Sequence, residues 1–196
     1  MQPLFNKGYD FVTNIPNFIS VKTYFYVGRR KAQGEEREPK TAAEIDISED
    51  VTKMEDGTNF LLADVCGEGR MLVFATEDGK NVLKNYKTFF VDGSFKSSSE
   101  QFKQLYSVHV GIGSSSDEIN ITAATYALLS RKDTSMYDRL FSILKNEAEW
   151  NPDTVIMDFE EAATIALCRT FPNVKINGCN FHFTQSLWEY IQELQG

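Results

Sequence analysis

The order of the apolar segments from Phe89 onwards constrains the fold most strongly. Three strand-like runs come first, and helical and strand-like segments then alternate; the three runs are TFFVDGSF, QLYSVHVGI and INITAATYALL. Consecutive strands favour an antiparallel meander, whereas strands separated by helices favour parallel pairing. The order β-β-β-α-β-α-β-α therefore predicts an α/β fold with a mixed five-stranded sheet and flanking helices.

The later segments change their period. Apolar residues recur every four positions from Met136 to Ala148, which predicts an amphipathic helix over 133–149 with Asp133 or Thr134 as its cap. The nearly all-apolar run TVIMDF is typical of a strand buried on both faces. Right-handed crossovers place this fourth strand beside the first, in the order 3-2-1-4-5. That arrangement is ribonuclease H-like.

A β-hairpin is predicted ahead of this pattern. NFLLADV and RMLVFAT are its strands, and Gly67 and Gly69 supply a permissive turn between them. We expect two regions: a poorly defined N-terminal region with a polar linker, residues 1–58, and a core, residues 59–196. The charge run from Gly28 to Lys40 is interpreted as a solvated linker, with a nucleic-acid-binding arm as the alternative.

Composition limits the classes of function. The chain has 196 residues, 42% of them hydrophobic, which is enough for one domain with a real core. Its formal net charge of −8 disfavours nucleic acid over the surface as a whole. Three cysteines without CxxC spacing indicate neither a disulfide framework nor a four-cysteine zinc site. No apolar run approaches the roughly 20 residues that span a bilayer. We expect a soluble intracellular protein without a membrane partner.

Two carboxylates follow the predicted central strands. Asp92 lies near the end of the first strand and Asp158 closes the fourth. If these strands are neighbours, the carboxylates lie side by side, where they repel by about 4 kcal/mol at about 4 Å and an effective dielectric of roughly 20. A pair of ionised carboxylates is typical of a magnesium site for phosphoryl transfer. The alternatives are a hairpin turn at Asp92-Gly93 and a helix cap at Asp158.

Several segments resemble the transposase domain of Mutator-like elements (MULEs), a eukaryotic family of the DDE/D transposase class. They are FATEDGKNVLKNYKTFFVDGSFKSSSEQFKQLYSVHV, YALLSRKDTSMYDRLF, VIMDFEEAATIALCRTFP and INGCNFHFTQSLWEYIQEL. The resemblance implies a ribonuclease H-like core that cleaves and transfers DNA strands with Mg²⁺ or Mn²⁺. It makes Asp92 the first catalytic and metal-binding acid and Asp158 the second. It also implies a nuclear location, a DNA partner and possible protein subunits. The family's third acid, a glutamate, is expected beyond Gly196.

Other residues have two readings each. Cys179 and His182 match the family's Cys-x-x-His element, as structural residues or as supports beside Asp158; zinc needs about four ligands, so we expect no structural zinc. Glu160 is either a first-turn carboxylate of a helix or a group that reaches back to a metal. Lys96 is either solvated or a phosphate contact, and His109 is interpreted as an ordinary half-buried histidine. The alternative function is a domesticated or remnant domain that binds protein or DNA without catalysis.

Overall fold

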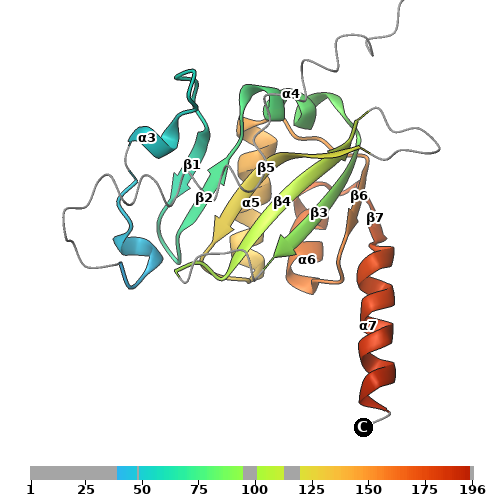
Figure 1. Ribbon diagram of the computed structural model, residues 1–196. Helices are drawn as coiled ribbons and strands as arrows, with labels where there is room; N and C mark the ends of the chain where they lie inside the picture. Colours follow the sequence, from blue (N-terminus) through green and yellow to red (C-terminus); the bar gives the residue numbers. More distant parts are fainter. Residues whose placement is uncertain (1–38, 48, 95–100, 113–119, 195–196) are drawn as a thin grey trace, which may run out of the picture.

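The computed structural model describes residues 39–47, 49–94, 101–112 and 120–194. Within them, one mixed sheet of seven strands runs in the order β1-β2-β5-β4-β3-β6-β7 (Figure 1). The strands are β1 Leu61–Val65, β2 Met71–Phe74, β3 Thr88–Ser94, β4 Gln104–Gly111, β5 Ile121–Leu129, β6 Thr154–Met157 and β7 Lys175–Gly178. The helices are η2 Ala42–Glu44, α3 Glu49–Thr52, α4 Glu77–Asn85, α5 Thr134–Glu147, α6 Glu161–Thr170 and α7 Asn180–Glu193. The predicted linker or arm up to residue 38 and Lys96 lie outside the described residues.

The strands from Thr88 onwards have the predicted order, but the prediction of five strands is wrong. The hairpin β1–β2 joins the same sheet, because β2 pairs antiparallel with β5 from Met71 opposite Leu129 to Phe74 opposite Tyr126. All four residues of β2 are buried. The hairpin thereby covers the edge of β5, which a five-stranded sheet would leave open to pairing with other chains. Its turn contains Gly69 with φ 97°, a conformation that favours glycine.

Helices α5 and α6 cover one face of the sheet, behind the strands as drawn in Figure 1. Helix α5 begins as predicted, because the Asp133 carboxylate accepts a hydrogen bond of 3.1 Å from the Met136 backbone N–H. Trp150 is fully buried between this layer and the sheet, with its ring 5.6 Å from that of Phe89 and 5.2 Å from that of Phe171. Phe89 and Val91 of β3 pack into this layer, so the face of β3 that carries them is turned towards the helices.

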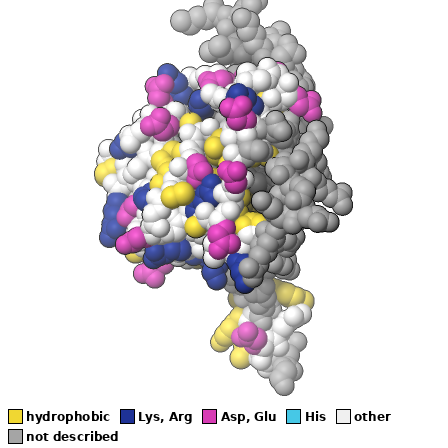
Figure 2. Space-filling view, turned by 90° about the vertical axis from the view of Figure 1, so that its left-hand side faces the viewer, with side chains coloured by type: hydrophobic (Ala, Val, Ile, Leu, Met, Phe, Trp, Pro, Cys, Tyr) yellow, Lys and Arg dark blue, Asp and Glu magenta, His cyan; other side chains and the backbone are white. Residues whose placement is uncertain are grey.

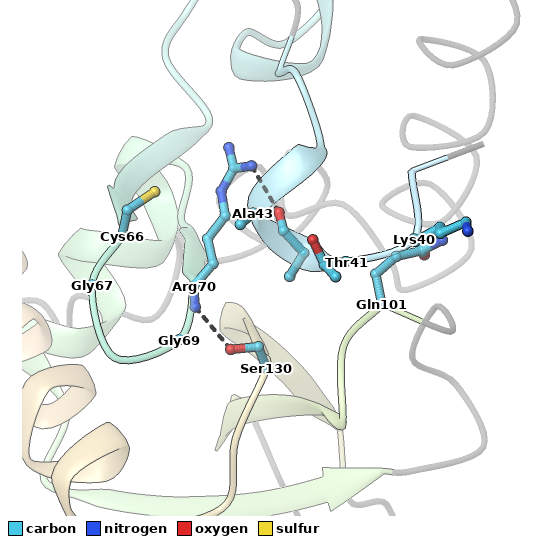
Figure 3. Close-up of a pocket in the computed structure, with 10 residues that line it drawn as sticks. Lys40, Thr41, Ala43, Cys66, Gly67, Gly69, Arg70, Gln101 and Ser130 are labelled. Carbon is cyan, nitrogen blue, oxygen red and sulfur yellow. Dashed lines mark hydrogen bonds between the residues drawn. The ribbon is translucent and has the colours of Figure 1, made fainter. Parts of the chain in front are cut away.

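Part of the opposite face is covered by the segment that precedes β1. A second buried cluster holds this segment to the sheet; it consists of Ala42, Phe60, Leu72, Phe74, Phe102, Leu105, Ala123, Tyr126 and Leu128. Arg70 reinforces the attachment: its guanidinium donates to both carboxylate oxygens of Asp64 and to the backbone carbonyls of Ala42 and Ile45. Figure 3 shows the Arg70 side chain beside this segment, near Thr41 and Ala43. A cavity of about 370 Å³ lies between Arg70, residues 40–43 and Ser130.

Helix α7 begins at the end of β7 and extends away from the sheet (Figure 1). Its large exposed apolar side chains are Phe181, Phe183, Leu187, Trp188, Tyr190 and Ile191, with Leu194 following the helix. Among the described residues, no helix combines the length and the apolar character needed to cross a membrane.

Arg70 gives a prediction about stability. Replacing Arg70 with Ala leaves the Asp64 carboxylate and two carbonyls without their donor. We expect a loss of about 2–3 kcal/mol in the free energy of unfolding, below the value for a fully buried pair because the Asp64 side chain is 30% exposed. Urea unfolding followed by tryptophan fluorescence measures the loss. Arg70→Lys keeps the charge but not the planar fork of donors, and should recover only part of it. An unchanged midpoint for Arg70→Ala would contradict this role.

Candidate functional site

The strand directions bring several polar residues to one edge of the sheet. Strand β6 runs parallel to β3 and β7, while β4 runs antiparallel to β3 and to β5. The carboxyl ends of β3, β5, β6 and β7 and the start of β4 therefore share this edge. Its polar residues are Asp92, Gln104, Lys132, Asp158, Glu160, Cys179 and His182. All site residues predicted from the sequence belong to this set.

Asp92 lies within β3, and Asp158 is the first residue after the neighbouring strand β6. The parallel pairing of β3 with β6 joins Thr88 to Thr154 and Phe90 to Ile156. Each pair is offset by 66 residues, and 158 − 92 is also 66. The offset of the paired residues is therefore also the offset between Asp92 and Asp158, two residues beyond the last pair. Asp92 thus lies inside β3 and is not part of a hairpin turn.

Asp92 faces away from the helices α5 and α6. Its neighbours Phe89 and Val91 point into the helix-covered cluster, so alternation along the strand turns Phe90 and Asp92 to the other face. The Asp92 side chain is 48% exposed. On β4, Ser107 pairs with Asp92, and its hydroxyl contacts the ring nitrogen Nε2 of His109 at 2.7 Å. A carboxylate with this exposure is accessible to a ligand from solvent.

Glu160 is more enclosed than Asp92. Its backbone N–H donates to Asp158 Oδ1 at 3.3 Å, and its side chain is 13% exposed. Glu160 Oε1 accepts a hydrogen bond of 2.7 Å from the Tyr137 hydroxyl and lies 3.6 Å from Lys132 Nζ. The charge of Glu160 is therefore partly balanced by a cation and a buried donor.

Tyr106 is buried within electrostatic reach of Asp92, Asp158 and Glu160. This residue pairs with Gly93 on β3 and is 2% exposed. Burial raises the pKa of Tyr106 well above its usual value, and the negative charges of Asp158, Glu160 and Asp92 raise it further. Its hydroxyl has no hydrogen-bond partner within the described part of the chain.

His182 and Cys179 lie at the start of α7. The sequence interpretation placed them beside Asp158; the structure brings His182 Nε2 to 3.6 Å from Asp92 Oδ1. Cys179 is the residue before the helix, and its backbone N–H donates to the Met157 carbonyl at 2.7 Å. Both residues thus tie the start of α7 to the strands that carry the aspartates.

No group of three or more His, Cys, Asp or Glu side chains in the described ranges is arranged to hold a metal ion. The donor set at the edge is the Asp92 and Asp158 pair. Two carboxylates fit magnesium, which is commonly held by one or two carboxylates with water and substrate phosphates completing its shell. A cation there would have the two aspartates as its protein ligands.

The comparison with known families decides the identity of the domain. The sequence model of the MULE transposase domain matches residues 88–186, half of the chain. The chain belongs to the MULE transposase domain family. The match runs from β3 into α7 and so includes both aspartates, Glu160, Cys179 and His182. No curated protein matches the chain.

Three residues of the site were not found from the sequence. Gln104, Lys132 and Tyr137 form the surroundings of Glu160. Tyr137 follows Met136 on the apolar side of its helix and has the sequence signal of a core residue. Gln104 is the first residue of β4 and is fully buried. Its burial marks it as unusual, but burial is known only once the strand order is known.

His109 gives a prediction about pH. Burial lowers the pKa of His109, and the charge of Asp92 opposes this effect. A folded-state pKa below the unfolded value of about 6.5 means that the folded protein binds fewer protons, so stability falls as the pH drops below about 6.5. Thermal unfolding of the parent and of His109→Gln between pH 7.5 and 5.5 measures this, and the variant should lose less stability on acidification. His182→Gln, at the only other histidine, is the control. Equal pH slopes for the parent and His109→Gln would contradict the assignment.

We also predict that Cys179 and His182 do not hold a structural zinc, because zinc takes about four ligands. Metal analysis after purification without added zinc tests this prediction. One tightly bound zinc per chain, lost in Cys179→Ser, would contradict it.

Proposed function

We propose that this chain is a transposase-derived domain with a ribonuclease H-like core, in which Asp92 and Asp158 hold Mg²⁺ or Mn²⁺ for cleavage and transfer of DNA strands. The observation that carries the proposal is the register of β3 with β6 in a domain of the MULE family, since its offset relates Asp92 in β3 to Asp158 directly after β6. DNA is the substrate that this family suggests, and a nuclear location and further protein subunits belong to the same proposal.

The residues at this edge of the sheet have different proposed roles. Asp92 and Asp158 offer hard oxygen ligands, and the half-exposed Asp92 leaves a side open to a phosphate. When bound, divalent cations activate the attacking oxygen and stabilise the leaving oxygen of an in-line displacement. His182 contacts Asp92 from α7, and Glu160 holds the Asp158 carboxylate through its backbone N–H. The residues therefore provide a two-carboxylate site with supported ligands.

A non-catalytic binding domain is the second candidate. It is favoured by the lack of a third metal-ligating side chain grouped with the two aspartates in the described residues. The net charge of −8 also weakens attraction to DNA phosphates. The two candidates differ in whether the aspartates bind metal, which can be measured directly.

We expect the chain to bind Mn²⁺ weakly and not to cleave DNA by itself. Two carboxylates leave a second ion short of protein ligands, and in-line displacement by this chemistry uses two ions about 3.5–4 Å apart. Titration calorimetry with Mn²⁺ should show binding that Asp92→Asn and Asp158→Asn each weaken by more than about tenfold. A nicking assay on supercoiled plasmid should show no product.

Two results would contradict these expectations. Absence of Mn²⁺ binding, or binding unaffected by both substitutions, would refute the metal site and favour the non-catalytic candidate. Plasmid nicking that both substitutions abolish would show instead that another carboxylate completes the second ion's shell.

A further inference from the structure

A series of contacts joins Gly93, the residue after Asp92, to the loop that carries Asp158. It begins at Gln104, which is fully buried and fills the space next to Gly93: a Cβ on Gly93 would lie 2.5 Å from Gln104 Nε2. Gln104 Nε2 donates to the Tyr137 hydroxyl at 2.8 Å, and that hydroxyl donates to Glu160 Oε1 at 2.7 Å. Glu160 N–H then donates to Asp158 Oδ1 at 3.3 Å. Packing at Gly93 and three hydrogen bonds thus connect β3 to the Asp158 carboxylate.

The direction of these hydrogen bonds is determined by the groups that can donate and accept. The Tyr137 hydroxyl has one proton, which it gives to Glu160, and it accepts from Gln104. Gln104 and Tyr137 are both fully buried, so solvent cannot replace either partner. Burial and the bond to Glu160 raise the pKa of Tyr137, so the hydroxyl keeps its proton.

The Glu160 carboxylate contacts Tyr137 and Lys132 through the oxygen Oε1. Turning this carboxylate towards a cation beside Asp92 would break the bond from Tyr137 and move it away from Lys132. A buried tyrosine and glutamine would then lose their partner, which is costly in a low-dielectric interior. Glu160 is better suited to hold the loop than to bind metal.

We propose that Gln104, Tyr137 and Glu160 are positioning residues that set the Asp158 loop relative to β3, and that Glu160 does not itself ligate the metal. The claim that these residues position a metal ligand rests on the proposed function. The hydrogen bonds themselves are present without metal. A positioning role accounts for the buried glutamine against Gly93 and for the tyrosine on the inner side of α5.

The test compares two tyrosines that differ in one respect. Tyr137→Phe removes the central hydroxyl of the chain. Tyr106→Phe is the matched control: its ring centroid lies 5.3 Å from that of Tyr137 and it is equally buried, but its hydroxyl has no hydrogen-bond partner among the described residues. Amide hydrogen exchange of residues 158–161 in the metal-free protein should be about tenfold faster in Tyr137→Phe and unchanged in Tyr106→Phe. Exchange in β2 serves as the internal reference for global stability.

Substitutions at Glu160 separate positioning from ligation. The amide oxygen of Glu160→Gln still accepts the hydrogen bond from Tyr137, whereas Glu160→Ala cannot. We expect Mn²⁺ affinity to fall about tenfold in Glu160→Ala and Tyr137→Phe, as for residues behind metal ligands, and to be largely restored in Glu160→Gln. Asp158→Asn serves as the reference for the loss of Mn²⁺ affinity expected when a metal ligand is removed.

The outcomes are distinguishable. Equal exchange at 158–161 in the two tyrosine variants would overturn the inference whether or not the protein binds metal. A loss in Glu160→Gln as large as that in Asp158→Asn would also overturn it, because Glu160 would then be a ligand. If the parent does not bind Mn²⁺ but exchange differs as expected, the positioning stands and the proposed metal function fails.

Discussion

The parallel pairing of β3 with β6 is the constraint on which the rest of the structure depends. It is the connection at which the antiparallel meander changes to parallel strands, and its register is fixed by buried residues on both strands, Phe89 opposite Val155 among them. A slip by one residue would turn these apolar side chains towards solvent. The same register has the 66-residue offset that separates Asp92 in β3 from Asp158 after β6. Core packing thus sets the geometry of the candidate site before any ligand is present.

The polar residues at this edge have unequal electrostatic surroundings. Glu160 is 13% exposed and contacts Lys132 and the Tyr137 hydroxyl, whereas Asp92 is 48% exposed and lies 3.6 Å from His182. The two aspartates therefore carry charge that a divalent cation would balance. Membership of the MULE family and the different surroundings of Glu160 and Asp92 both favour the divalent-cation chemistry that we propose. Because Glu160 is enclosed and Asp92 is open to solvent, we propose that Glu160 holds the Asp158 loop and that Asp92 binds the metal.

The sequence predicted the elements from Thr88 onwards and their order, because alternation and helical period are local signals. The site at Asp92 and Asp158 stays a prediction. The sequence did not predict seven strands, since the pairing of β2 with β5 depends on which sheet edge is free, and that is a non-local property. Nor did it reveal Tyr137 as a partner of Glu160, or Gln104 as a partner of Tyr137. Tyr137 satisfies the apolar pattern of α5, and its hydroxyl gains a function only when β4 and the Asp158 loop lie within reach.

The most direct test of the central claim is the position of a bound metal. Diffraction from crystals of the protein soaked in Mn²⁺, recorded at a wavelength where manganese scatters anomalously, locates the ion independently of the protein model. The account predicts a peak within about 2–2.5 Å of carboxylate oxygens of both Asp92 and Asp158, with none on Glu160. A peak that touches neither aspartate, or carboxylates of Asp92 and Asp158 more than about 10 Å apart, would contradict a shared metal site.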